Sequence, residues 1–257
     1  NMGLNAYEYS CTRGVNIKEE TARAIGKEAC RWGITLSIHA PYYINLATID
    51  EEKKLKNKKY IFDALKAAEW MGATRVVFHP GSCAKIDREQ AFHMAELLFK
   101  EITNDNMYFF DKGIKLCPET MGKINQLGTL DEVLYLCSLS DAVLPTVDFG
   151  HIHALGQGRI NTIDDYAFIL DCIQNGLSGS RSQNFHVHFS RIEYTRGGEK
   201  KHWTLDDVKY GPDFEPLAEL LVKRDMKPTI ICESRDRMAE DALKLKTIYD
   251  EKLYLFN

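Results

Sequence analysis

Six side chains that can bind a metal ion recur along the chain at similar intervals. They are His39, His79, Glu119, Asp148, His188 and Glu233, with gaps of 40, 40, 29, 40 and 45 residues. Imidazole nitrogens and carboxylate oxygens are ligands that Zn²⁺ and Mn²⁺ accept in proteins. A lone histidine at the end of a strand is more often a hydrogen-bonded core residue. Six residues in register therefore indicate a metal site, in which Glu119 could bridge two ions.

Each of these residues ends or directly follows a short apolar run, which is typical of a buried β-strand. The candidate strands are Ala6–Ser10, Ile34–His39, Arg75–His79, Ile114–Glu119, Val143–Asp148, Asn184–His188 and Thr229–Glu233. Amphipathic stretches with helical spacing lie between them. These are Lys18–Trp32, Asp63–Trp70 within a longer run from Glu52, Arg88–Asn104, Thr129–Leu136, Asp164–Gln174 and Phe214–Arg224.

Alternating strands and helices predict a parallel sheet with right-handed crossovers. A length of 257 residues suits one (β/α)8 TIM barrel, so residues 1–257 are expected to form a single α/β domain. The carboxyl ends of barrel strands lie on one rim, where the six ligands should converge. Only seven strands are visible, and the opening NMGL resembles a helix running into a strand. We expect that a first strand and helix are missing from this chain; a seven-stranded barrel is the alternative.

Composition indicates a soluble globular protein, with 44% apolar and 27% charged residues and a net charge of −4. No apolar run is long enough to span a membrane, and from the opening residues we expect no signal peptide. The seven cysteines form no C-x-x-C pair, and several lie in apolar segments. They predict reduced core residues in a cytoplasmic protein, which we expect to be monomeric.

Four further histidines bear on the site. Asp148 and His151 form a D-x-x-H pair, so one loop could offer ligands to two ions. His153 in that loop either supports a ligand or is simply packed. His186 and His188 are two residues apart on one strand and share a face, and His188 is preferred because it ends the strand.

The segment Arg191–His202 carries four basic and two acidic residues and contains the last of these histidines, His202. A local basic patch of this kind can contact nucleic acid even in an acidic protein. A solvated loop explains the charges equally well.

Several short motifs together resemble the endonuclease IV family of apurinic/apyrimidinic endonucleases, within the xylose-isomerase-like barrels. They are HAPYYINLA, FHPG, PET, DFGHIHA, HFSR and the CES of the last strand, between His39 and Glu233. The resemblance implies a (β/α)8 barrel with a three-zinc cluster. In it, His39, His79 and Glu119 would hold one ion; Glu119, Asp148, His188 and Glu233 a second; and His151 and His202 would help to hold a third. Glu119 would be catalytic, orienting or deprotonating the attacking water.

The chain departs from the family at the third ion. The family pattern is Asp-x-His, but here Lys200 stands in the place of the carboxylate before His202. An ammonium group has no lone pair for a metal. Glu199 could substitute only if the loop shifts. We therefore expect two or three Zn²⁺, or Mn²⁺, and we expect Lys200→Asp to raise the occupancy of the third site.

The resemblance also implies damaged double-stranded DNA as the partner. Tyr42 stands where the family inserts an aromatic wedge into DNA, and Arg191, Lys200 and Lys201 could contact phosphates. Alternatively, Tyr42 covers the pocket and the charged groups are solvated.

The predicted function is that of a metal-dependent DNA repair endonuclease, a hydrolase that cuts the phosphodiester 5′ to abasic sites. The alternative is a sugar isomerase or epimerase, for which Glu119, Asp148, His188 and Glu233 would suffice. The extra histidines at 39, 79, 151 and 202 favour the nuclease, whereas Lys200 favours the isomerase. A degenerate barrel that only binds DNA or a partner is disfavoured by the largely intact ligand set.

Overall fold

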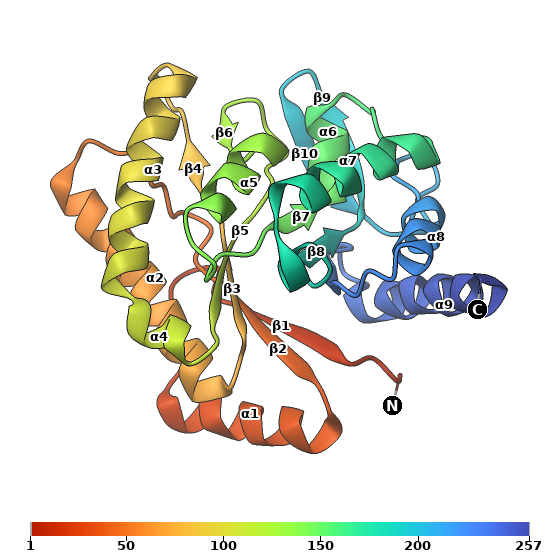
Figure 1. Ribbon diagram of the computed structural model, residues 1–257, viewed down its shortest axis with the longest axis horizontal. Coiled ribbons are helices and arrows are strands. Elements are labelled where there is room, and N and C mark those ends of the chain that lie inside the picture. Colours follow the sequence, from red (N-terminus) through yellow and green to blue (C-terminus); the bar gives the residue numbers. More distant parts are fainter. Residues whose placement is uncertain (1, 257) are drawn as a thin grey trace. The chain divides into compact units, whose positions relative to one another are not determined.

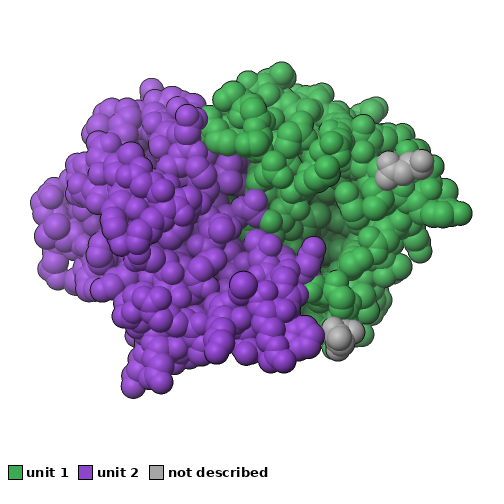
Figure 2. All heavy atoms as spheres, turned by 60° about the horizontal axis from the view of Figure 1, so that its bottom comes forward, with its two compact units in different colours: residues 1–4, 120–124, 146–257 green, residues 5–119, 125–145 purple. Residues whose placement is uncertain are grey.

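The computed structural model describes residues 2–256, and these fall into two compact units. Unit 2 consists of residues 5–119 and 125–145, and unit 1 of the remaining segments, 120–124 and 146 onward together with the N-terminal residues (Figure 2). Each unit has its own set of parallel strands. The prediction of one single domain stays a prediction.

Unit 2 contains four parallel strands in the order β1-β2-β3-β5 (Figure 1). They are β1 (Ala6–Ser10), β2 (Thr35–His39), β3 (Arg75–Phe78) and β5 (Lys115–Pro118). Leu116 of β5 also forms a parallel bridge with Val143. A two-residue antiparallel ribbon joins β4 (Gly81–Ser82) to β6 (Gln126–Leu127).

The helices of unit 2 begin and end where local chemistry favours it. They are α1 (Glu19–Trp32), α2 (Glu51–Met71), α3 (Arg88–Asp105), α4 (Met107–Asp111) and α5 (Leu130–Ser138). Asp50 and Asp87 accept hydrogen bonds from backbone N–H groups in the first turns of α2 and α3. Thr129 and Glu132 form a capping box at α5. Both α1 and α2 end at a glycine in the left-handed conformation.

Unit 1 contains three parallel strands in the order β11-β8-β7 and an antiparallel hairpin, β9–β10. The strands are β7 (Thr146–Asp148), β8 (His186–Phe189), β9 (Arg191–Thr195), β10 (Gly198–Trp203) and β11 (Thr229–Cys232). The helices are α6 (Phe149–Leu155), α7 (Ile163–Gly176), the 3₁₀ turn η1 (Gly179–Ser182), α8 (Glu215–Lys223) and α9 (Met238–Phe256).

The seven predicted strands are confirmed, each within a few residues of its expected bounds, and all pair in parallel. The segment after Asp148, which the sequence suggested was a loop, is instead the short helix α6. Helix α9 was not predicted because it buries only Asp241 and Leu245 and so lacks a wide apolar stripe.

All seven cysteines are free thiols, and Cys117 and Cys232 are buried as expected. Across residues 2–256, no helix combines the length and apolar character needed to cross a membrane.

Candidate metal centre

Three ligands from three strand ends converge within unit 2. His39 ends β2, and His79 and Glu119 directly follow β3 and β5. The Nε2 atoms of both histidines lie 3.2 Å from Oε2 of Glu119, which is 1% exposed. The imidazole rings are nearly perpendicular, with centroids 5.0 Å apart. The predicted first set of ligands is thus brought together.

The hydrogen bonding of His39 suits a metal ligand. Its Nδ1 lies 2.7 Å from the carbonyl oxygen of Ala40, which can only accept, so Nδ1 donates and carries the proton of the neutral ring. The Nε2 lone pair then faces the carboxylate oxygen of Glu119. Two lone pairs repel each other unless a cation or proton lies between them. The donor set therefore fits a divalent ion, in the manner of metal-bound histidines held by a carbonyl.

A second set of ligands lies within unit 1. Parallel pairing of β7 with β8 places Asp148 directly beside His188, and Nδ1 of His188 is 3.4 Å from Oε1 of Glu233. One ligand atom from each of the three lies within 4.8 Å of the others. Asp148 is fully buried. A buried carboxylate is stable only when it is compensated, so this set also fits a cation.

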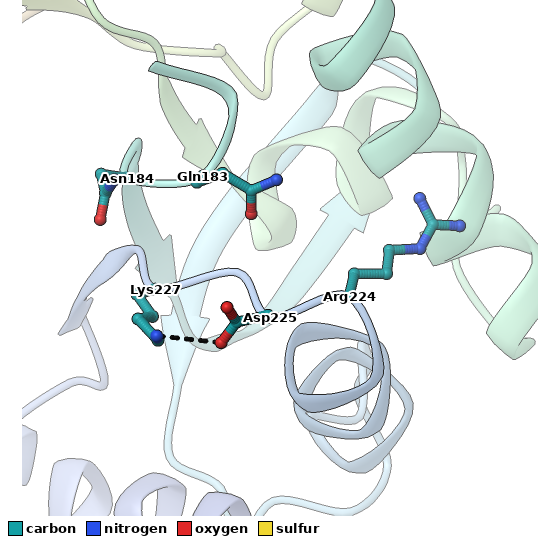
Figure 3. A pocket seen from close by; sticks show the side chains of 5 residues that line it. All are labelled: Gln183, Asn184, Arg224, Asp225 and Lys227. Atoms are coloured by element: carbon teal, nitrogen blue, oxygen red, sulfur yellow. Dashed lines mark ion pairs between the residues drawn. The ribbon is translucent and has the colours of Figure 1, made fainter. Parts of the chain in front are cut away.

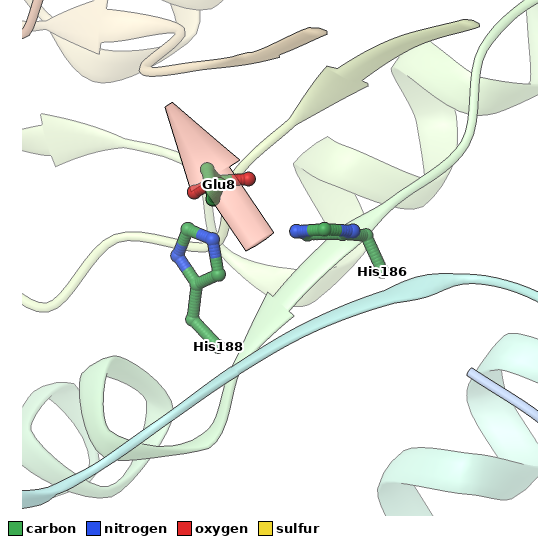
Figure 4. Close-up of side chains that lie close together, drawn as sticks. All are labelled: Glu8, His186 and His188. Carbon is green, nitrogen blue, oxygen red and sulfur yellow. The ribbon is translucent and has the colours of Figure 1, made fainter. Parts of the chain in front are cut away.

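His186 and His188 project from the same side of β8 (Figure 4), with ring centroids 5.2 Å apart. His188, which lies nearer the carboxyl end of the strand, is the one grouped with Asp148 and Glu233. This is the placement that the sequence favoured. The bridging role predicted for Glu119 involves residues of both units and stays a prediction.

A third set of ligands, also within unit 1, contains His151, Glu199 and His202. Nδ1 of His151 donates to the carbonyl oxygen of Thr120 at 2.9 Å, and its Nε2 lies 3.4 Å from Oε2 of Glu199. Nδ1 of His202 lies 2.8 Å from Oγ of Ser190, and its Nε2 lies 3.8 Å from Oε1 of Glu199. Both imidazoles thus turn Nε2 towards one carboxylate, the same motif as in unit 2.

Asp148 also positions His151. As the N-cap of α6, its Oδ1 accepts a hydrogen bond of 2.7 Å from the backbone N–H of His151. The D-x-x-H spacing is therefore a helix start. Through this cap Asp148, a member of the second set, orients His151, a member of the third set.

A β-bulge explains how Glu199 reaches this set. In the hairpin, Glu199 pairs with Tyr194 and His202 pairs with Ile192, and the register shifts between Glu199 and Lys201. Residues 192 and 194 share one face of the strand, so their partners share it too. Lys200 is the extra residue of the bulge. On a regular strand without a bulge, Glu199 and His202, which are three residues apart, would face opposite sides.

Lys200, which the sequence aligned with the family's carboxylate, lies outside the third set in this structure. Its Nζ lies 2.6 Å from Oε1 of Glu193, and this hydrogen bond lowers the pKa of Glu193 and raises that of Lys200. Glu199 supplies the carboxylate instead. Nothing in the sequence marked the bulge that brings Glu199 into the set.

Gly122 makes room for this arrangement. A Cβ at this position would lie 2.7 Å from Cβ of Glu199 and 3.0 Å from Cδ2 of His151. Only glycine allows the backbone to approach the two ligands so closely.

The residues predicted to contact DNA differ in their surroundings. Tyr42 follows β2 and is 58% exposed. Nζ of Lys201 lies 3.4 Å from the ring centroid of Trp203. Arg191 is mostly buried: its guanidinium donates to the carbonyl oxygens of Leu205 and Tyr210 and pairs with Asp213, so it organises the loop after the hairpin. Contacts of these residues with DNA stay predictions.

A polar hollow of about 380 Å³ lies at the opposite, amino-terminal ends of β8 and β11 (Figure 3). Its charged groups are already paired, Lys227 with Asp225 at 2.9 Å and Arg224 with Asp171 at 2.6 Å. Residues at this end of barrel strands usually serve stability. The metal-binding groups remain the candidate site.

Comparison with known proteins places the chain in a family. The chain is 34% identical over 97% of its length to an uncharacterized protein of Methanocaldococcus jannaschii, covering 89% of that protein. It is 29% identical over 90% of its length to a probable endonuclease 4 of Acholeplasma laidlawii, covering 83% of it.

Two solved structures share the fold over 99% of this chain. One is a D-tagatose 3-epimerase-like protein, with a TM-score of 0.75, 21% identity and 90% of that chain covered. The other is endonuclease IV from Thermus thermophilus, with a TM-score of 0.68, 19% identity and 91% covered. A family model described as xylose isomerase-like TIM barrel matches residues 1–253. The chain therefore belongs to the xylose isomerase-like TIM barrel family.

Proposed function

We propose that this protein is a metal-dependent DNA endonuclease that hydrolyses the phosphodiester on the 5′ side of abasic sites. The observation that carries the proposal is the pair of matching sets, His39–His79–Glu119 and His151–Glu199–His202, in each of which two Nε2 atoms face one carboxylate. A sugar isomerase needs neither set. Similarity to probable endonuclease 4 supports the proposal.

The three sets would hold two or three ions, with Zn²⁺ suited to their nitrogen and oxygen donors. Bound ions of this kind acidify a water molecule and neutralise charge on the phosphate oxygens. The chain's own residues prepare the site: the carbonyl groups of Ala40 and Thr120 fix the tautomers of His39 and His151. Glu119 is the proposed general base, because its buried carboxylate can accept the proton of the attacking water.

A sugar epimerase or isomerase is the second candidate. It is favoured by the set Asp148, His188 and Glu233, which resembles the simpler ligand set of a one-ion enzyme. On this alternative the two imidazole-rich sets would carry no ion. Metal content therefore separates the two functions.

The test combines metal analysis with a nicking assay. Protein stripped with a chelator and reloaded with Zn²⁺ should hold two or three ions per chain and nick a duplex at a single abasic site, leaving the undamaged duplex intact. Glu119→Gln should lower the nicking rate by roughly 10²- to 10⁴-fold while the circular dichroism spectrum is retained.

His93→Gln is the matched control, because His93 lies exposed on α3 outside all three sets. It should leave both metal content and nicking unchanged. One bound ion per chain, no nicking and turnover of a ketose would overturn the proposal in favour of a sugar enzyme.

A further inference from the structure

A pocket of about 330 Å³ lies beside the β9–β10 hairpin in unit 1. Its walls come from helix α6, the segment after it, strand β9 and the loop after the hairpin. The side chains that matter are His153, Asn161, Tyr194, Lys209 and Tyr210. No metal-ligand residue lines it. Its volume is in the range of small-molecule sites.

Two tyrosine rings are held firmly in the wall. The ring of Tyr194 meets His153 edge-on at 5.6 Å, and its hydroxyl fills the space beside Gly158, where a Cβ would lie only 2.2 Å away. Tyr210 stacks on Trp203 at 5.2 Å with an interplanar angle of 12°. Rigid aromatic rings of this kind form platforms on which planar groups stack.

A cation and a hydrogen-bond acceptor stand next to these rings. Within residues 2–256, Lys209 forms no ion pair, and its Nζ lies 5.5 Å from the ring centroid of Tyr210. Asn161 uses its Nδ2 to donate to the carbonyl of Gly158 at 2.5 Å, which leaves Oδ1 as an acceptor. The pocket thus combines a cation, a hydrogen-bond acceptor and aromatic surfaces.

Helix α6 relates the pocket to the third set of metal ligands. His151 and His153 are two residues apart on this helix, so their side chains point about 200° apart around its axis. His151 turns towards Glu199, whereas His153 turns towards the pocket. Helix α6 therefore presents one histidine to the third set and the other to the pocket.

We infer that this pocket binds one nucleotide of the substrate strand, with its base against the tyrosines, the base edge at Asn161 and a phosphate at Lys209. The inference rests on the proposed action on DNA and adds a second contact point away from the cut. According to this inference, a ligand must carry both a base and a phosphate to bind the pocket well.

The experiment measures binding of deoxyadenosine 5′-monophosphate by ligand-observed NMR, using chelator-treated protein so that catalysis plays no part. Deoxyribose 5-phosphate, which has no base, should bind at least tenfold more weakly. Tyr210→Leu should weaken nucleotide binding by roughly 5- to 100-fold through lost stacking. Asn161→Ala and Lys209→Ala should each weaken it by roughly tenfold, the size of a charge-assisted or base-edge contact.

Lys85→Ala is the control, since Lys85 is an exposed lysine of unit 2 that is remote in sequence from the pocket. Circular dichroism identifies any variant that fails to fold. If Tyr210→Leu fails to fold, Asn161→Ala still tests the inference. Equal binding of the two ligands, or unchanged binding in both Asn161→Ala and Lys209→Ala, overturns the inference. Nucleotide binding without any nicking would instead refute only the proposed nuclease activity.

Discussion

Glu199 and Lys200 are neighbours with opposite surroundings, and this contrast decides which of them can serve a metal. Glu199 faces the Nε2 atoms of His151 and His202, whereas Lys200 pairs with Glu193. We expect Glu199→Gln to weaken Zn²⁺ binding at the third set by at least roughly 10- to 100-fold. Lys200→Asp should leave the metal content unchanged. Competition with a zinc indicator measures both, and a gain of one ion in Lys200→Asp would restore the interpretation based on sequence alone.

Gly122 offers a steric test of the same set. Gly122→Ala introduces a methyl group 2.7 Å from Cβ of Glu199, so the hairpin must shift. We expect a loss of about 1–3 kcal/mol in the free energy of unfolding, together with loss of the third ion. Urea denaturation and metal analysis measure the two effects.

Gly197→Ala is its matched control on the same hairpin, because a Cβ there would meet only Oγ1 of Thr195 at 3.7 Å. Normal metal content in both variants would show that Glu199 is not required at its observed position.

At the scale of secondary structure, the β9–β10 hairpin is the element that sets the ligand geometry. Deleting Lys200 removes the bulge and leaves the sequence Glu-Lys-His, with the two ligands two residues apart on a regular strand. Glu199 and His202 should still share a face, so we expect the third ion to be retained within about threefold in affinity. The same zinc competition measures this affinity. Loss of the third ion when Lys200 is deleted would show that the bulge does more than place Glu199 and His202 on one face of the hairpin.

The strands could be predicted from the sequence, whereas helix α6 and the β-bulge could not. Short apolar runs located all seven parallel strands, and six of these runs end in His, Asp or Glu, because a strand's period and its burial are local properties. The start of α6 was misinterpreted as a loop, although Asp148 caps it. The bulge at Lys200 escaped prediction because it depends on pairing with β9 and on the space left by Gly122. Both are tertiary effects.

At the scale of the whole molecule, the net charge of −4 opposes association with DNA. The proposed binding to a duplex must therefore come from a local group of cations. Lys209 lacks an ion-pair partner among residues 2–256, and Lys201 lies over the ring of Trp203. The charge of Lys200 is largely matched by Glu193. These differences should appear in the salt dependence of DNA affinity.

Each phosphate contact contributes a slope of about −0.9 to the plot of log affinity against log salt concentration. For zinc-loaded Glu119→Gln protein, which should bind an abasic duplex without cutting it, we expect Lys201→Ala and Lys209→Ala each to reduce the slope by about one. Lys200→Ala should reduce the slope by much less, because Lys200 is paired with Glu193 and is not expected to contact a phosphate. Fluorescence anisotropy between roughly 50 and 200 mM salt measures the slopes. An equal effect of all three substitutions would mean that Lys200 leaves Glu193 for a phosphate when DNA binds.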